Sequence, residues 1–328
     1  LSRFDYDSNR FVRYRFPDGI TPRVGCLIED ADGNILVGTA GYGVYAVRKG
    51  QDAITQETQF SRRKDNDFVG VLFEDAQHNL WRGYQTDTIT KMKVSALHPT
   101  ATKDYVSPYG PVLDFLRDGN NSFLAVCMYG ILRYNPQTAA LDDAGYDMSA
   151  LGGEVSIRAA LIDHAGNIYV GSSGRGLFVI PAGTRTLQRV QNTNGKYDLS
   201  TANVNHLFED KDKNLWVSCY KKGLYEIGKG RDAFATWKFA DQNFSLGSSV
   251  SSVTAGDNGS IWCTVQKSGI YQFDKDGKIS AAPASPAVPL PPTTTGSSQV
   301  EYTVGIATCS GTIGSSRQTA LPASRLSG

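Results

Sequence analysis

Residues 204–227 read VNHLFEDKDKNLWVSCYKKGLYEI, three short apolar runs separated by two polar turns. The runs cover residues 204–208, 215–220 and 224–227, and they are rich in β-branched and aromatic side chains. Runs of this length and composition, bounded by Asx- and Gly-containing turns, favour strands over a helix. The middle run is apolar on both faces, which predicts a sheet that is covered on both sides.

The same pattern occurs six times along the chain. Its Asn position recurs at intervals of 45, 43, 45, 47 and 46 residues, at Asn34, Asn79, Ser122, Asn167, Asn214 and Ser260. An acid precedes this position by four residues at Asp30, Asp75, Asp118, Asp163 and Asp210, and Gly256 replaces it in the sixth copy. A glycine stands eight or nine residues after it at Gly43, Gly130, Gly176, Gly223 and Gly269. Self-similarity at this period with strand content is typical of a β-propeller, in which each repeat forms one four-stranded blade.

The sequence therefore predicts an all-β fold, with a β-propeller over residues 1–280 and a low-complexity tail over 281–328. Residues 1–23 match the part of a repeat after its glycine, so we expect them to form a half-blade made of its two outer strands. Six four-stranded repeats occupy 24–280. The composition of the tail is typical of a linker. However, an unclosed ring would leave unpaired strand edges, so we expect part of 295–320 to pair with the half-blade and complete a seventh blade.

Charge and hydropathy exclude several classes of protein. The 33 basic and 32 acidic side chains nearly cancel, which argues against binding to nucleic acid or to a membrane surface in bulk. No apolar run approaches the roughly 20 residues that a membrane span needs. The chain begins at Leu1 without a signal peptide, so we expect it to be cut from a larger precursor.

No catalytic, metal or cofactor motif is recognisable. Asp210, Asp212 and Asn214 imitate the start of an EF-hand loop, but Lys221 stands where the bidentate Glu belongs. We therefore expect these Asx side chains to close tight turns. The aromatic residues two places after the Asn position are interpreted as packing residues rather than sugar platforms. The cysteines show no CxxC spacing and are interpreted as small buried strand residues, at Cys26, Cys127, Cys219, Cys263 and Cys309.

Three copies share a clear sequence motif: LIEDADGNILVGTAGYGVYAV at 27–47, LIDHAGNIYVGSSGRGLFVI at 161–180 and LFEDKDKNLWVSCYKKGLYEI at 207–227. They resemble the two-component regulator propeller repeat, known from the periplasmic sensor region of hybrid two-component systems. The second and third copies match this pattern more loosely, and the sixth lacks the acid and the Asn.

The resemblance implies a function for the parent protein. Such receptors carry two seven-bladed propellers, a β-sandwich, a membrane helix and a histidine kinase module, and they bind a carbohydrate signal in the periplasm. The expected partners are thus an oligosaccharide and the parent's second propeller and β-sandwich, and the resemblance also admits a homodimer. No catalysis and no cofactor are expected in this segment itself.

The ligand is expected on one particular face of the disc. In a four-stranded blade, the turns between second and third strands share a face with the connections between blades, and here these turns vary from copy to copy. Loops on a rigid scaffold commonly carry recognition. The variable turn residues are aromatic or cationic, which suits stacking on sugars and pairing with carboxylate or sulfate groups. The predicted binding residues are Tyr42, Gln85, Tyr129, Arg175, Lys221, Lys222 and Lys267.

Two other functions stay open at this point. A propeller enzyme acting on a polysaccharide or small molecule would gather His, Glu or Arg side chains from several blades into one pocket, with shifted pKa values. A protein-interaction scaffold would instead show an exposed apolar patch of several hundred Å².

Overall fold

Nearly all regular structure in the computed structural model of the chain is β. The structure describes residues 1–5, 10–57, 67–84, 88–95, 98–119, 121–153, 155–190, 198–228, 234–237, 250–256, 259–265 and 269–281. Two 3-10 turns are the helical elements among these residues, η1 (Pro17–Gly19) and η3 (Ser149–Leu151). No helix in the described ranges has both the length and the apolar character needed to span a membrane. The all-β class predicted from the repeats is therefore confirmed.

The described strands form six four-stranded antiparallel sheets, here called blades 1 to 6, and one two-stranded sheet. The two-stranded sheet pairs β1 (Ser2–Asp5) with β2 (Arg10–Arg13). Blade 1 contains β3 (Val24–Glu29), β4 (Ile35–Thr39), β5 (Gly43–Val47) and β6 (Ile54–Gln56). Blade 2 contains β7 (Val69–Glu74), β8 (Asn79–Tyr84), β9 (Thr88–Ser95) and β10 (His98–Val106). Blade 3 contains β11 (Val112–Arg117), β12 (Phe123–Cys127), β13 (Ile131–Asn135) and β14 (Ala140–Asp143).

Blades 4 to 6 repeat this order. Blade 4 contains β15 (Ile157–Ile162), β16 (Ile168–Ser172), β17 (Leu177–Ile180) and β18 (Gln188–Arg189). Blade 5 contains β19 (Val204–Glu209), β20 (Leu215–Cys219), β21 (Gly223–Ile227) and β22 (Phe234–Trp237). Blade 6 contains β23 (Val250–Ala255), β24 (Ile261–Val265), β25 (Gly269–Phe273) and β26 (Ile279–Ala281).

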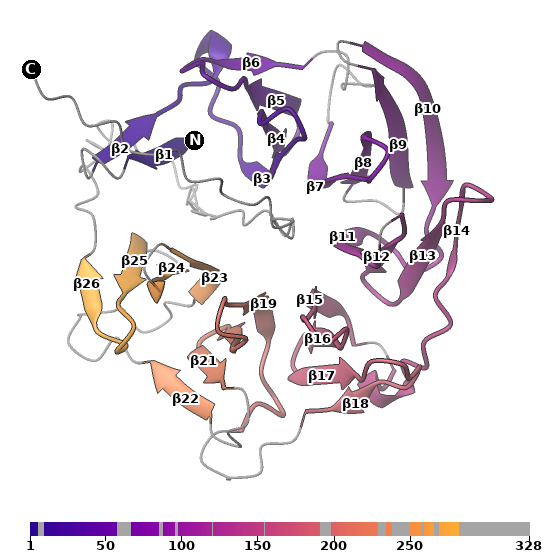
Figure 1. Ribbon diagram of the computed structural model, residues 1–328, viewed down its shortest axis with the longest axis vertical. Coiled ribbons are helices and arrows are strands. Elements are labelled where there is room, and N and C mark those ends of the chain that lie inside the picture. Colours follow the sequence, from indigo (N-terminus) through magenta and orange to yellow (C-terminus); the bar gives the residue numbers. More distant parts are fainter. Residues whose placement is uncertain are drawn as a thin grey trace, which may run out of the picture.

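The blades are arranged around a common axis as a propeller (Figure 1). The first strand of each blade lies nearest the centre, and consecutive first strands from β3 to β23 are in contact. In the view of Figure 1, β1 and β2 lie at the perimeter between β26 and β6, within the segment predicted to be a half-blade. The predicted closing strands in 295–320 lie outside the described residues, so closure into seven blades stays a prediction.

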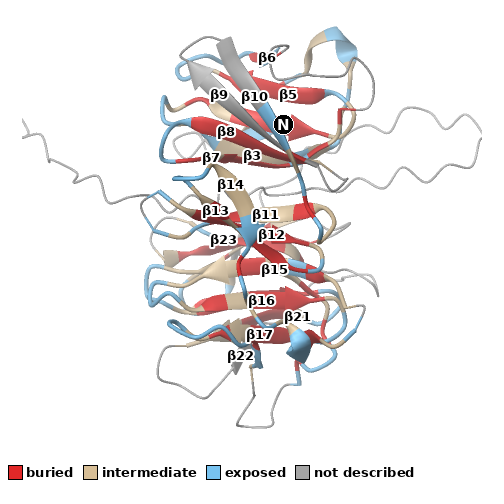
Figure 2. Cartoon of the chain, turned by 90° about the vertical axis from the view of Figure 1, so that its right-hand side faces the viewer, coloured by how far each residue is buried: buried red, intermediate tan, exposed pale blue. Residues whose placement is uncertain are grey.

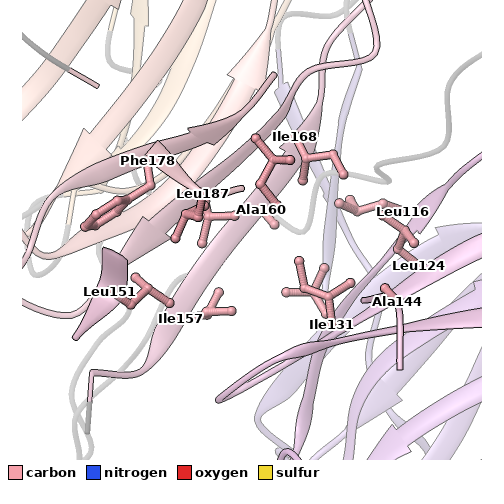
Figure 3. Packing of buried hydrophobic residues seen from close by; sticks show 13 residues of the cluster. Leu116, Leu124, Ile131, Ala144, Leu151, Ile157, Ala160, Ile168, Phe178 and Leu187 are labelled. Atoms are coloured by element: carbon pink, nitrogen blue, oxygen red, sulfur yellow. The ribbon is translucent and has the colours of Figure 1, made fainter. Parts of the chain in front are cut away.

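Stability comes from the faces between blades. Figure 2 shows buried residues along the strands and exposed residues mainly at the turns. Between blades 3 and 4, Leu124 and Ile131 on one side meet Ile157 and Ile168 on the other (Figure 3). Each side chain of this size contributes about 1.5–3 kcal/mol when it is fully buried. Because a blade has no covered face of its own, it is stable only when stacked on its neighbours.

The repeated aromatic position is part of this packing. Trp81, Trp216 and Trp262 are all at most 8% exposed. Trp81 lies 4.8 Å from Phe123 and 4.9 Å from Tyr134 between ring centroids, so it joins blade 2 to blade 3. The packing role predicted for these residues is therefore confirmed for the three tryptophans.

The repeated Asp and Asn form a hydrogen-bonded turn between the first two strands. In blade 5, Asp210 Oδ1 accepts hydrogen bonds from the backbone N–H groups of Asp212 and Asn214, both at 2.9 Å. Its Oδ2 accepts from Asn214 Nδ2 at 3.0 Å and from Trp216 Nε1 at 2.8 Å. Asp75, Asn79 and Trp81 repeat this arrangement in blade 2. The turn-closing role predicted for these residues is confirmed. We call this side of the disc the Asx face.

The described cysteines behave as packing residues. Cys127, Cys219 and Cys263 are buried on second strands and Cys26 is half-buried, and all four are free thiols. Burial raises the pKa of Cys127 to about 11 and the pKa values of Cys219 and Cys263 to about 12. Since the thiolate is the reactive form, these thiols are inert near neutral pH. Cys309 lies outside the described residues.

Candidate ligand-binding face

The face opposite the Asx face, here called the loop face, carries the turns between second and third strands together with the connections between blades. Backbone hydrogen bonds join the two kinds of segment. Gly43 N donates to Asp67 O at 3.0 Å, Tyr129 N to Tyr109 O at 3.0 Å, Gly176 N to Ala202 O at 2.9 Å and Tyr220 N to Asn203 O at 2.8 Å. The turns of blades 1, 3, 4 and 5 are thus anchored to a neighbouring connection, which makes this face a rigid platform.

Exposed tyrosines occupy equivalent turns on this face. Tyr42, Tyr129 and Tyr220 are 46%, 52% and 40% exposed and follow the second strands of blades 1, 3 and 5. They are three of the four exposed large hydrophobic side chains in the described part of the chain, the other being Val106 on β10. The sequence pattern predicted Tyr42 and Tyr129 as binding residues but placed Tyr220 at the end of a strand. The structure ends β20 at Cys219, so Tyr220 is a turn residue.

The turn of blade 3 is especially well supported. The ring of Tyr109 lies so close to Gly130 that a Cβ there would be 2.6 Å from Tyr109 Cγ. The Tyr109 hydroxyl donates to Asp143, whose other oxygen accepts from Gly145 N at 2.6 Å. These hydrogen bonds lower the pKa of the Asp143 carboxyl, and the bond to Asp143 raises the pKa of Tyr109. A tyrosine held by a carboxylate thus lies next to the exposed Tyr129, which bonds to its backbone.

The predicted cationic residues of blades 4 and 5 lie on the same face, but their side chains differ in the contacts that hold them. Arg175 is exposed and rests against Gly152, where a Cβ would be 2.6 Å from its Nη1. Lys221 is exposed, with its Nζ 5.2 Å from the centroid of the Tyr220 ring. Lys222 instead donates to Thr201 Oγ1 at 3.0 Å, so it helps to hold the connection between blades 4 and 5.

The structure brings some of the predicted residues onto one continuous surface. Ile157 N donates to Met128 O at 2.8 Å, and Ser173 N donates to Ser156 O at 2.9 Å. The turns that carry Tyr129 and Arg175 are therefore joined through the connection between blades 3 and 4. Tyr42 lies on blade 1, apart from this group. Gln85 and Lys267 lie outside the described residues.

A buried ion pair supports the loop face at blade 2. Arg82 on β8 is fully buried, and its Nη1 lies 3.6 Å from Oδ2 of Asp67, which is 2% exposed. Its Nη2 donates to the Tyr84 hydroxyl. Asp67 is also the residue that pairs with Tyr42 through its backbone. In the other five blades, the residue at the strand position of Arg82 is apolar and fully buried. These residues are Val37, Ala125, Val170, Val217 and Cys263. The sequence pattern did not reveal this pair because Asp67 and Arg82 meet only through the fold.

One group on the Asx face has donor atoms that suit a metal ion. Atoms of Asp163, His164 and Glu209 lie within 4.8 Å of one another. Glu209 already accepts hydrogen bonds from the backbone N–H and the Nδ1 of His164. Glu74 accepts from the Ala31 N–H at 2.8 Å in the same way between blades 1 and 2. We therefore interpret the Glu209 carboxylate as a link between blades 4 and 5.

Comparison with known proteins identifies a family that one repeat of the chain matches. Residues 198–221 match the two component regulator propeller family. The chain carries a two-component regulator propeller repeat. That repeat contains β19, β20 and the Asp210 turn, and it ends at Lys221 on the loop face. No curated protein sequence matches the chain.

Solved structures share the propeller fold of this repeat protein. PorZ, described as an essential surface component of the type-IX secretion system of Porphyromonas gingivalis, is 18% identical at a TM-score of 0.55, over 73% of this chain and 37% of PorZ. The extracellular domain of a putative one component system from B. thetaiotaomicron is 14% identical at a TM-score of 0.52, over 76% and 38%. The WD40 propeller of Doa1 is 13% identical at a TM-score of 0.59, over 80% and 83%. At these identities the similarity shows the fold alone. The chain spans less than two fifths of the first two proteins.

Proposed function

We propose that this propeller is the ligand-sensing module of a two-component signalling receptor, and that it binds an oligosaccharide on the loop face. The observation that carries the proposal is the placement of Tyr42, Tyr129 and Tyr220 on equivalent turns of one face. Anchored aromatic rings can stack on sugars with little loss of conformational entropy. The nearby Arg175 and Lys221 suit a ligand that carries carboxylate or sulfate groups.

The same proposal places the module outside the cytoplasm, in the periplasm, and leaves catalysis to a histidine kinase elsewhere in the parent protein. The two-component regulator repeat supports this assignment. The structural similarity to the extracellular domain of a putative one component system is consistent with it. The partners proposed with it are the parent's second propeller and β-sandwich, and a second copy of the receptor.

The enzyme alternative receives less support from the described residues. The histidine whose pKa is shifted, His206, pairs with Ser218 across β19 and β20. Ser218 shares its side of the strand with Trp216, which packs against blade 6, so His206 faces the next blade rather than the loop face. No group of His, Glu and Arg side chains converges on the exposed tyrosines among the residues that the structure places.

Calorimetric titration with a panel of neutral and acidic oligosaccharides tests the proposal. The informative variant is Tyr42→Ala, Tyr129→Ala and Tyr220→Ala combined, and Val106→Ala is the control because Val106 is exposed but lies on β10. Since each stacking aromatic contributes of the order of 1 kcal/mol, we expect the triple variant to bind at least tenfold more weakly and the control to bind normally. Equal affinity of the triple variant and the unmodified protein would remove the loop face from the proposal. Capture of a protein rather than a sugar by the three tyrosines would favour the scaffold alternative.

A further inference from the structure

The first strand of every blade contains a β-bulge at the same place. The register between the first and second strands shifts directly after the first residue of the inner strand in all six four-stranded sheets. The residues at the bulges are Gly25, Gly70, Leu113, Arg158, Asn205 and Ser251. A bulge re-aims a side chain out of the regular alternation of a strand, and bulges are often found beside functional sites.

These six positions form a ring around the axis at the loop face. The bulges lie at the starts of the innermost strands, which the connections on the loop face enter (Figure 1). At two of these positions the side-chain direction is toward the next blade. A Cβ on Gly25 would be 2.7 Å from Val69 O, and Asn205 Nδ2 donates to Val250 O at 3.2 Å. The ring is therefore a set of equivalent positions on neighbouring blades.

The two halves of the ring differ in chemistry. Blades 1 and 2 have glycine at the bulge, and both glycines are exposed. Blades 4, 5 and 6 have Arg158, Asn205 and Ser251, which are all polar. Ser251 Oγ shares a hydrogen bond of 2.7 Å with Thr264 Oγ1. Blades 1 and 2 thus present backbone at the ring, whereas blades 4 to 6 present polar side chains, of which Asn205 and Ser251 are already hydrogen-bonded within the protein.

Arg158 is the charged member of the ring. It is exposed, although the preceding Ile157 is only 2% exposed and the next residue, Ala159, is half-buried. It has no hydrogen bond or ion pair with any residue that the structure describes. A guanidinium group without such a partner suits an oxyanion because it can donate two parallel hydrogen bonds to it. The amide of Asn205 is on the adjoining inner strand, since β15 and β19 are in contact.

We propose that Arg158, with Asn205 on the adjoining inner strand β19, forms an anion-binding subsite at the axis of the loop face. It takes a carboxylate or sulfate group, while the exposed glycines of blades 1 and 2 have no side chain to obstruct the rest of the ligand. Its assignment to an acidic sugar rests on the proposed function, whereas its anion chemistry rests on the ring itself. Tyr129 and Arg175 then contact parts of the ligand that lie farther from the axis.

The test is calorimetry at low ionic strength, because salt screens exposed charges. The probes are inorganic sulfate, trigalacturonate and the methyl ester of trigalacturonate, which keeps the size of the sugar but removes its charge. The variants are Arg158→Gln, Arg158→Lys and the control Lys275→Gln, which removes a charge from the turn between β25 and β26. Lys275 is exposed, with its side chain at 78%. Circular dichroism checks that each variant is folded.

We expect saturable binding of sulfate and trigalacturonate to the unmodified protein and to Lys275→Gln. Loss of a charge-assisted bond weakens binding by roughly tenfold or more, so Arg158→Gln should lose at least that factor and Arg158→Lys should lose less. Sulfate binding without trigalacturonate binding would support the subsite and count against the acidic-sugar assignment. Equal binding of the acid and its ester, unchanged in Arg158→Gln, would overturn the subsite and leave oligosaccharide sensing intact. Absence of saturable anion binding would overturn it as well.

Discussion

The buried pair of Arg82 and Asp67 predicts an unusual response to mutation. With Arg82 fully buried and Asp67 at 2% exposure, neither charge is screened by solvent. Asp67→Ala therefore leaves a guanidinium group in the interface between blades 1 and 2 without its carboxylate. Removing one partner of a buried pair costs about 3–5 kcal/mol. With a slope of about 2–3 kcal/mol per M of urea, the unfolding midpoint should fall by at least about 1 M.

The double variant Asp67→Ala with Arg82→Met should recover most of this loss. Blade 5 already has an apolar pair at these two positions. The carbonyl of Ala202 accepts from Gly176 N as that of Asp67 accepts from Gly43 N, and Val217 occupies the strand position of Arg82. Methionine fills a space similar to that of arginine, and an apolar replacement of a buried pair is often neutral or stabilising. Urea unfolding of the unmodified protein, both single variants and the double variant gives the coupling energy. A double variant no more stable than Asp67→Ala, or a single variant within about 1 kcal/mol of the unmodified protein, would refute this reasoning.

Three further predictions concern the blades. Burial lowers the pKa of His206 from 6.5 to about 4, so the unfolded chain binds the proton more tightly than the folded protein does. The free energy of unfolding should therefore fall by about 3 kcal/mol as the pH drops from 6.5 to 4. Urea unfolding at a series of pH values should show a weaker pH dependence of this free energy in His206→Gln. Trp216→Phe removes the 2.8 Å hydrogen bond to Asp210 and should lower the free energy of unfolding in urea by about 1.5–3 kcal/mol. Trp262→Phe should cost less, because Gly256 replaces the acid in that copy. Equal losses in the two variants would contradict the role of the acid. Gly130→Ala places a Cβ 2.6 Å from Tyr109 and should cost about 1–3 kcal/mol by thermal unfolding, but much less in a Tyr109→Ala background.

The sequence was sufficient for the features that one repeat encodes by itself. The Asp210–Asn214 turn and the buried Trp216 depend on residues within seven positions of each other, and five of the six copies repeat the acid of this turn. The all-β propeller and the packing of the tryptophans could therefore be predicted. The placement of Tyr42, Tyr129, Arg175 and Lys221 on one face also results from strand order alone.

The features that the sequence did not predict depend on contacts between residues far apart in the chain or on the register of paired strands. Arg82 looks like a surface residue until Asp67, in the preceding connection, folds against it. Tyr109 meets Asp143 across 34 residues of chain. The bulge at Arg158 is a shift in register, which no residue pattern within one copy reveals. Tyr220 was not predicted as a turn residue because the apolar run in the sequence continues through it. The strand itself ends one residue earlier, at Cys219.

Oligosaccharide recognition by the loop face is tested most directly by footprinting. Hydroxyl-radical labelling followed by mass spectrometry measures the solvent access of Tyr42, Tyr129 and Tyr220 in one experiment, with and without an oligosaccharide that calorimetry shows to bind. We predict that the bound sugar lowers labelling of at least two of these tyrosines and leaves Val106 unchanged. A sugar that binds with full stoichiometry but leaves all three tyrosines equally labelled would contradict recognition by this face.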